Sequence, residues 1–382
     1  MNTDNRSAGA LLIALTFGWA TACQPISQRT PAATTPPLKL NQIQVVGSHN
    51  SYKGAIEPAL MRALMARDSA LFLSLDYQHI PLPAQLDLGL RKLEIDVVHD
   101  PQGGRYARPL GIALVEQSGQ TPLPFDSLGK MKSPGFKVLH VQDIDFRSQC
   151  LRLRDCLQEI KDWSRAHPNH LPIAVSFNAK TDLINQPGFV RPLAFTSATF
   201  DSLDAEIRAV FPPEYILTPD QVRGEHPSLE AAVKAQHWPS LADCRGKVLF
   251  VLDEGGEKRA SYVRGHPSLR GRVMFVNAPP GQPEAAFIIL NDPIQYRDSI
   301  QSLVRSGYLV RTRADEGTRE ARAGDYRRWE AALASGAHFI STDYYRADER
   351  FGTGYRIQLP AGAVARCNPV ASPDGCGNER LE

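Results

Sequence analysis

The chain has 382 residues and a formal net charge of +2 with histidine neutral, and 42% of its residues are hydrophobic and 8% aromatic. The nearly balanced charge excludes the basic footprint of a nucleic-acid-binding protein, and the hydrophobic fraction is that of an ordinary globular protein. The length exceeds that of most single domains, but an α/β barrel of about 250 residues or more forms one domain. We expect a monomer with one large core.

The N-terminal residues predict export. Residues 8–20 form an apolar run that is too short to span a membrane comfortably, and Ala20, Thr21, Ala22 and Cys23 follow it. We expect a signal peptide over residues 1–22 and a Pro/Thr-rich tether over residues 23–39. Two alternatives remain open. Cleavage after Ala22 leaves a soluble periplasmic or secreted enzyme, whereas lipid attachment at Cys23 leaves an outer-membrane-anchored lipoprotein.

Polar residues with catalytic potential follow the first expected strand. Val45 and Val46 carry a buried-strand pattern, Gly47 and Ser48 interrupt it, and His49 and Asn50 follow. The elements expected next are a helix over 58–75, a short helix over 83–88, a strand over 91–98, an active-site loop over 99–135, a strand over 136–141, a helix over 150–166 and a strand over 171–177.

The second half continues the alternation of strands and helices. Strands are expected over 247–252, 272–276, 308–313 and 337–342, with helices over 202–211, 228–236, 298–306 and 316–335. This alternation predicts a (β/α)8 barrel of TIM type, somewhat irregular, over residues 40–360, with a C-terminal tail over 361–382. An additional strand over 286–290 leaves the strand count open by one.

The cysteines support an oxidising compartment. With Cys23 cleaved off or lipidated, Cys150 and Cys156, and Cys367 and Cys376, form two close local pairs that suit disulfides. Metal binding is the rival interpretation, but these cysteines lack the CxxC spacing and nearby histidines of a zinc site. Cys244 is then a buried free thiol.

Polar groups at several strand ends suggest one site. Glu94 and Asp96 are two residues apart and therefore face the same side of a strand, where they can hold one cation. His140 follows the apolar residues of the third expected strand, and Asn178 and Lys180 follow the fourth strand. Two histidines with a cation suit phosphodiester cleavage, because one histidine removes a proton from the attacking hydroxyl and the other protonates the leaving oxygen.

The motifs GSHNSY, LRKLEIDV, KVLHVQDIDF and HFISTDYY resemble the calcium-dependent phosphoinositide phospholipase C family of bacteria and fungi, within the PLC-like phosphodiesterase superfamily, from about residue 40 to 376. The resemblance implies that His49 and His140 are the catalytic pair and that Asn50, Glu94 and Asp96 bind calcium, one Ca²⁺ rather than Mg²⁺. It further implies attack by a substrate hydroxyl on its own phosphate, which gives a cyclic phosphate and diacylglycerol.

One residue departs from that pattern. The fourth strand usually ends in Glu-x-Lys, whereas this chain has Asn178, Ala179 and Lys180. The Asn178 amide oxygen can still bind calcium, but the site loses a negative charge, so its calcium affinity should fall. Lys180 is either a phosphate contact or a surface lysine at the strand end.

The last strands carry further charged residues. Arg311 and Arg313 alternate along one strand and share a face, so Arg313 either binds phosphate or pairs with Glu94 or Asp343. Asp343 is a candidate for orienting a histidine. We interpret Asp143 and Asp145 as loop and capping groups.

Three functions follow from these observations. The first is an exported, calcium-assisted phosphodiesterase that acts on phosphatidylinositol or a related glycerophospho compound, with peripheral membrane contact. The second is a glycerophosphodiester phosphodiesterase on the same barrel, which would take water-soluble, deacylated substrates. The third is a non-catalytic envelope protein in which Asn178 marks lost activity.

Overall fold

The computed structural model describes residues 37–374, 376–377 and 381–382. The expected signal peptide, Cys23 and almost all of the tether lie outside the described residues. Within them, no helix is both long enough and apolar enough to cross a membrane.

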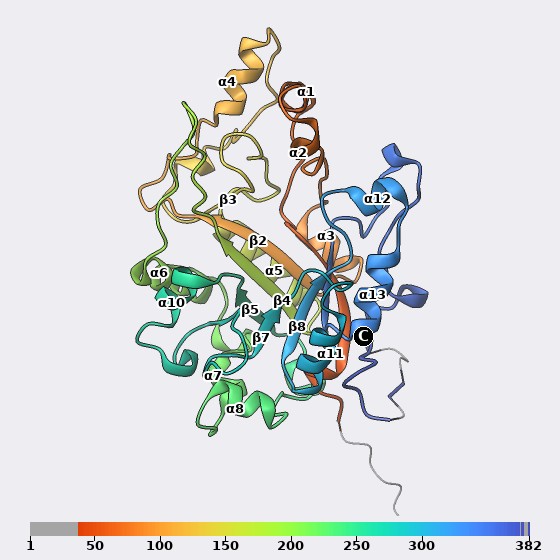
Figure 1. The fold of residues 1–382 in the computed structure, drawn as a ribbon. Helices are drawn as coiled ribbons and strands as arrows, with labels where there is room; N and C mark the ends of the chain where they lie inside the picture. Colours follow the sequence, from red (N-terminus) through yellow and green to blue (C-terminus); the bar gives the residue numbers. More distant parts are fainter. Residues whose placement is uncertain (1–36, 375, 378–380) are drawn as a thin grey trace, which may run out of the picture. The chain divides into compact units, whose positions relative to one another are not determined.

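In the described part of the chain, eight parallel strands form a nearly closed barrel in the order β6, β5, β4, β2, β1, β9, β8, β7 (Figure 1). A parallel bridge between Asn277 and Phe287 connects the two ends of this series. The fold is therefore the expected TIM-type barrel. The strands are β1 Ile43–Ser48, β2 Lys92–Val98, β4 Ile173–Ala179, β5 Val248–Leu252, β6 Met274–Val276, β7 Phe287–Ile289, β8 Leu309–Arg313 and β9 Phe339–Thr342.

The strand expected over 136–141 is not a barrel strand, and the additional strand over 286–290 is one. The run over 136–141 contributes only β3 (Lys137–Val138), which pairs antiparallel with the end of β2 through Val97 and Val138. No further parallel strand can enter the barrel beside β2, because both of its edges have barrel neighbours, β4 from Lys92 to Val97 on one side and β1 through Lys92 on the other. The eighth barrel position belongs to β7, within the optional strand over 286–290.

Several helices differ from their expected extent. The helix expected over 58–75 is broken into α1 and α2 because the Asp68 side chain caps a new helix at the backbone NH of Leu71. The helix expected over 316–335 is broken at Gly324, which has φ of 64°. The loop over 99–135 contains α4. The helices are α1 Pro58–Met65, α2 Ser69–Leu73, α3 Leu82–Asp87, α4 Leu110–Gln117, α5 Leu153–Ala166, α6 Ser197–Val210, α7 Pro219–Arg223, α8 Leu229–Lys234, α9 Leu241–Cys244, α10 Gly256–Val263, α11 Arg297–Arg305, α12 Arg319–Ala323 and α13 Arg327–Ser335.

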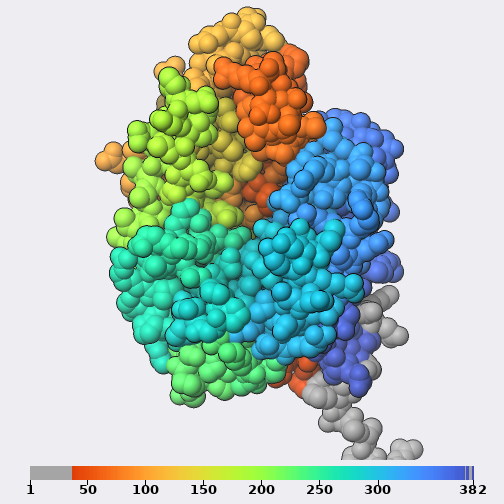
Figure 2. All heavy atoms as spheres, viewed as in Figure 1, coloured from red at the N-terminus to blue at the C-terminus, as the bar shows by residue number. Residues whose placement is uncertain are grey.

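The segments after β1 and β2 rise together above one end of the barrel. Helices α1, α2 and α4 lie side by side in Figures 1 and 2, in orange and yellow-orange. They share a small apolar cluster of their own, which includes Leu60, Leu64, Val115 and Phe146. This cluster is separate from the main core, so the lobe is packed as a wall beside the mouth of the barrel.

Gly47 explains how close β1 comes to β2. A Cβ atom at this position would lie 2.2 Å from the backbone oxygen of Lys92, far inside van der Waals contact. Gly47 is also the residue through which β1 pairs with Lys92 of β2. The glycine is needed for close approach, and it brings His49 and Glu94 to the same end of the barrel.

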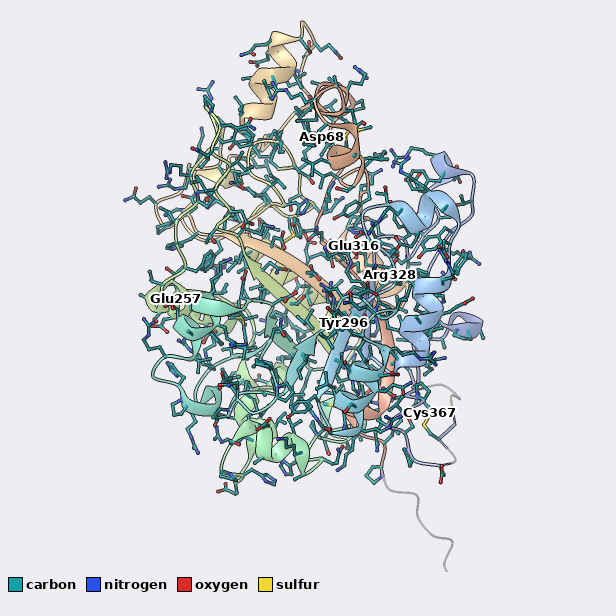
Figure 3. All side chains as sticks on the ribbon, viewed as in Figure 1. Asp68, Glu257, Tyr296, Glu316, Arg328 and Cys367 are labelled. Atoms are coloured by element: carbon teal, nitrogen blue, oxygen red, sulfur yellow. A yellow bond between two sulfur atoms is a disulfide. The ribbon has the colours of Figure 1, made fainter. Side chains whose placement is uncertain are left out.

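The tail closes the opposite end. Strand β10 (Ala365–Cys367) pairs antiparallel with the first residues of β1, Val45 opposite Ala365. Both expected disulfides are present, Cys150 to Cys156 and Cys367 to Cys376, and Cys244 is buried and free. Cys367 is far from the helical lobe in Figure 3, so the disulfide from Cys367 to Cys376 stabilises the barrel and not the lobe beside its active-site end.

Candidate active site

The carboxyl ends of the strands surround a cavity of about 180 Å³. Every site residue expected from the sequence lines this cavity, and three further polar side chains join them. The lining residues are His49, Asn50, Glu94, Asp96, His140, Asn178, Lys180, Asp253, Asn291, Arg311 and Arg313. Residues from six barrel strands and the β3 hairpin thus meet at one place, although they are spread along the sequence from residue 49 to residue 313.

His49 is held by a buried carboxylate. Its Nδ1 atom lies 2.9 Å from Oδ1 of Asp343, and Arg313 donates to the other oxygen of Asp343 at 3.1 Å. Although burial acts to raise the pKa of Asp343, His49 and Arg313 hold it at about 2, so the residue stays ionised. Asp343 therefore orients the imidazole, as the sequence suggested.

The other nitrogen of His49 faces charged groups of the cavity. Nε2 lies 3.4 Å from Nη1 of Arg313 and 3.5 Å from Oε1 of Glu94. Burial, and next the nearby Arg313, lower the pKa of His49 below its ordinary value of 6.5. A neutral imidazole with its proton on Nδ1 can accept a proton at Nε2, which is the property of a general base.

His140 has the same kind of support from different residues. Its Nδ1 atom lies 2.7 Å from Oδ2 of Asp145, and the ammonium of Lys53 lies 3.2 Å from Oδ1. Lys53 is fully buried and also donates to the carbonyl oxygens of Leu75 and Tyr77 at 3.0 and 2.9 Å. Burial raises the pKa of Asp145, but Lys53 and His140 outweigh it and hold the pKa below its usual value.

The interpretation of Asp145 as a capping group is wrong, while that of Asp143 is confirmed. Asp143 accepts hydrogen bonds from the backbone NH groups of Leu110 and Val190 at 2.9 and 2.7 Å. Asp145 supports His140 instead, because a tight turn pairs Val141 with Asp145 and returns the carboxylate to the histidine. The Asp-x-Asp spacing alone does not distinguish the two roles.

The expected oxygen ligands carry ion pairs within the protein. Glu94 is bound by Lys92 and, at 2.6 Å, by Arg311, and Asp96 lies 3.4 Å from Lys180. Burial acts to raise the pKa of Glu94, but Arg311 and Lys92 hold it well below its usual value, so this carboxylate is ionised. Arg311 is the residue that pairs with Glu94, and Arg313 pairs with Asp343.

The two amides are anchored through their NH₂ groups. Asn50 donates to the hydroxyl of Tyr77 at 2.8 Å, and Asn178 donates to the backbone oxygen of Asp253 at 3.0 Å. Asn50 adopts φ of 46°, in the left-handed region that asparagine tolerates better than most residues. Each amide keeps its carbonyl oxygen for another partner, which is the atom that a hard cation would bind.

These donors fit a calcium ion only when the amides take part. Among the described residues, no group of three histidine, cysteine, aspartate or glutamate side chains is arranged to hold a metal ion by itself. Calcium takes six to eight oxygens at flexible geometry, including carbonyl oxygens and water. Asn50 and Asn178 with Glu94 and Asp96 supply oxygens of this kind around one cavity.

Sequence reasoning missed Asp253 and Asn291 as members of the site. Asp253 comes directly after β5 and Asn291 two residues after β7, so a search for polar residues after each apolar strand would have found both. Burial, with Glu94 and Asp96 nearby, raises the pKa of Asp253 to about 6, against the influence of Arg311.

A wider groove adjoins the cavity. It has a volume of about 610 Å³, shares His49, His140 and Arg313 with the inner cavity, and is also lined by Asp343. Its outer wall combines the α2 residues Ala70 and Leu73 with the basic residues Arg319 and Arg322. Glu316, labelled in Figure 3 beside Arg328, also lines the groove and pairs with Arg319 at 3.5 Å. The groove leads from the solvent to both histidines.

The described chain is a TIM-type barrel with two carboxylate-supported histidines at the end of its strands, and its class is that of the PLC-like phosphodiesterases. The model of one family, "Phosphoinositide phospholipase C, Ca2+-dependent", matches residues 38–369. The chain belongs to this family, and it is a phosphoric diester hydrolase of the phospholipase C type.

One solved structure supports the fold. The chain is similar to the Ca²⁺-dependent phosphatidylinositol-specific phospholipase C of Streptomyces antibioticus, with 19% identity, a TM-score of 0.50, and coverage of 81% of this chain and 95% of that one. It is also similar to the calcium-dependent enzyme of a Pseudomonas species, with 17% identity, a TM-score of 0.49, and coverage of 87% and 96%. No match was found among curated proteins.

Proposed function

We propose that this protein is an exported, calcium-assisted phospholipase C that converts phosphatidylinositol-type lipids into a cyclic inositol phosphate and diacylglycerol. The observation that carries the proposal is the pairing of two histidines across one cavity, each with a buried carboxylate on Nδ1, at 2.9 Å for His49 and 2.7 Å for His140. Family membership favours this reaction over that of a glycerophosphodiester phosphodiesterase.

The proposed reaction transfers two protons. His49 removes the proton of the inositol hydroxyl next to the phosphate ester, and that oxygen bonds to phosphorus. The bond from phosphorus to the glycerol oxygen breaks, and His140 gives its proton to this oxygen to release diacylglycerol. Holding the hydroxyl in line with phosphorus contributes several kcal/mol without activating water. Lys180 and Arg313, which line the cavity, stabilise the charge on the phosphoryl oxygens.

We assign the calcium ion to Asn50, Glu94, Asp96 and Asn178, with water and substrate completing the shell. When bound there, it would supply positive charge to the phosphoryl oxygen and to the attacking hydroxyl. Glu94 and Asp96 must then exchange part of their contacts with Arg311 and Lys180 for the ion. Both cationic side chains remain in the cavity to contact phosphate.

We also propose peripheral contact with a lipid surface. Four leucines on the segments that follow β1, β2 and β4 are at least half exposed, and these segments surround the active-site end of the barrel (Figure 2). They are Leu71 at 56%, Leu123 at 53%, Leu128 at 83% and Leu183 at 50%. Insertion of such side chains would bring the groove to the membrane surface. The two disulfides suit an exported protein.

The test is phosphorus NMR of the early products from phosphatidylinositol vesicles, with calcium and with a chelator. We expect inositol cyclic phosphate first, acyclic phosphate later, and a rate that the chelator abolishes. Acyclic phosphate appearing first would assign His49 to the activation of water. Turnover of glycerophosphoinositol without turnover of the intact lipid would instead establish the glycerophosphodiesterase, and no turnover of either would establish a non-catalytic protein.

A further inference from the structure

Asp253 occupies a position next to the one where the family pattern has a carboxylate. Strands β4 and β5 pair in parallel with Phe177 opposite Leu252, so Asn178 and Asp253 follow neighbouring strands at the same level. The backbone NH of Asp253 donates to the oxygen of Phe177 at 2.8 Å, and the Asn178 amide donates to the backbone oxygen of Asp253. These two hydrogen bonds hold the ends of β4 and β5 together, and both side chains line the same cavity.

The carboxylate of Asp253 has few hydrogen-bond or ion-pair partners in the protein. Its side chain is only 16% exposed and its ion pair with Arg311 is long, at 3.9 Å. Arg311 directs its shorter contacts elsewhere, to Glu94 at 2.6 Å, Asn291 at 2.7 Å and Ser341 at 3.0 Å. Within residues 37–374, no side-chain or backbone donor forms a hydrogen bond to the Asp253 carboxylate. Burying such a group is costly unless a partner neutralises it.

The balance of charges around the cavity also favours a role for Asp253 in cation binding. Glu94, Asp96 and Asp253 face three cationic side chains, Lys180, Arg311 and Arg313. With their buried partners Asp343 and Lys92 included, four carboxylates balance four cations. Without Asp253, three carboxylates would face four cations, and a divalent cation would enter a positively charged cavity. Ligand charge count sets the calcium affinity of oxygen sites, so a third carboxylate is needed to compensate for Asn178.

We propose that Asp253 is an oxygen ligand of the active-site calcium and replaces, from the neighbouring strand, the carboxylate that Asn178 does not provide. This inference rests on the proposed function. It explains how the chain can carry an amide at the end of β4 and still hold a divalent cation beside the two histidines.

The experiment is calorimetric titration of the substrate-free protein with Ca²⁺. Asp253→Asn should weaken calcium binding about tenfold or more, because a charged oxygen ligand is lost while the side-chain volume is kept. The matched control is Asp182→Asn, since Asp182 lies 3.8 Å from Lys180 but is 81% exposed and outside the cavity. This control should change the calcium affinity by less than about twofold.

A second variant tests the compensation directly. Asp253→Asn combined with Asn178→Glu should return the affinity to within a few-fold of the wild type, because the carboxylate is restored on the adjacent strand. Calcium binding by Asp253→Asn that equals the wild type would overturn the inference and leave the proposed function intact. A wild-type protein that binds no calcium would overturn both. A loss in Asp253→Asn that Asn178→Glu cannot restore would reduce Asp253 to a structural partner of Arg311.

Discussion

The Nδ1 atom of His140 lies 2.7 Å from Oδ2 of Asp145, and this carboxylate is buried against the ammonium of Lys53. His49 has the same arrangement with Asp343 and Arg313. In both cases the carboxylate fixes the histidine tautomer, and a buried cation fixes the carboxylate. The two supports come from different parts of the chain, Lys53 from the segment after β1 and Arg313 from β8.

Replacement of either histidine should abolish most of the activity. We expect His49→Ala and His140→Ala each to lower kcat by roughly 10² to 10⁴, since each removes one proton-transfer group. The measurement is release of radiolabelled inositol phosphate, with circular dichroism as the control for folding. Wild-type turnover by either folded variant would remove that histidine from the mechanism.

Asp145→Asn should lower kcat with little change in KM. The amide cannot hold the His140 tautomer or stabilise its charged form, and we expect a loss of about 10- to 10³-fold. Asp143→Asn is the comparison, because Asp143 caps two backbone NH groups and should affect Tm more than kcat. Equal effects of both variants on kcat would show that Asp145 has no special role for His140.

Asn178→Glu in the otherwise unchanged chain should tighten calcium binding. The added carboxylate supplies a further negative charge at the end of β4, and affinity rises with the charge of the ligands. Calorimetry measures this without any substrate. Equal or weaker binding in the variant would place Asn178 outside the metal shell.

Gly47→Ala should destabilise the barrel by about 3 kcal/mol or more. The new Cβ would lie 2.2 Å from the backbone oxygen of Lys92, and neither strand can move without breaking the β1–β2 contact. Gly255→Ala is the matched control, because a Cβ added there would have no neighbour within 4 Å and the residue has φ of −115°. Urea unfolding should show a change of about 1 kcal/mol or less for the control, because Gly255 is the N-cap of α10, where alanine is somewhat less favourable than glycine.

His338 should make the fold sensitive to acid. It is buried away from the cavity, where Val310 NH donates to its Nδ1 at 3.0 Å and its Nε2 lies 2.9 Å from the oxygen of Asn41. Burial lowers the pKa of His338 to about 4. The unfolded chain, with a pKa near 6.5, therefore binds this proton more readily, and stability is lost as the pH falls from about 6.5 to about 4.

The size of this effect is measurable. The difference between the pKa of His338 in the unfolded and folded chain corresponds to about 3.5 kcal/mol of unfolding free energy, at about 1.4 kcal/mol for each pKa unit. Urea unfolding between pH 7 and pH 4 compares the wild type with His338→Gln, which cannot take up the proton. The same slope of unfolding free energy against pH in both proteins would contradict the assignment.

Local patterns in the sequence determined the class of fold and the set of strand-end residues. Apolar runs that end in His49, in Glu94 and Asp96, and in Asn178 are short-range signals, since a barrel strand and the polar residue after it are adjacent in the chain. The disulfides were predictable for the same reason, because their cysteines are six and nine residues apart. The roles of the site residues remain predictions that the experiments above test.

Tertiary structure alone decided which partner each group has. The run over 136–141 stays outside the barrel because β1 and β4 take the two edges of β2. The run over 286–290 enters it because β7 pairs with β8 and bridges to the end of β6. Asp145 meets Lys53 and Asp343 meets His49 only when the barrel closes, and Asp253 joins the cavity only because β4 and β5 are neighbours. Hydrogen bonds and ion pairs act over a few ångströms. A single sequence gives the separation of two residues along the chain, but it does not give their separation in space.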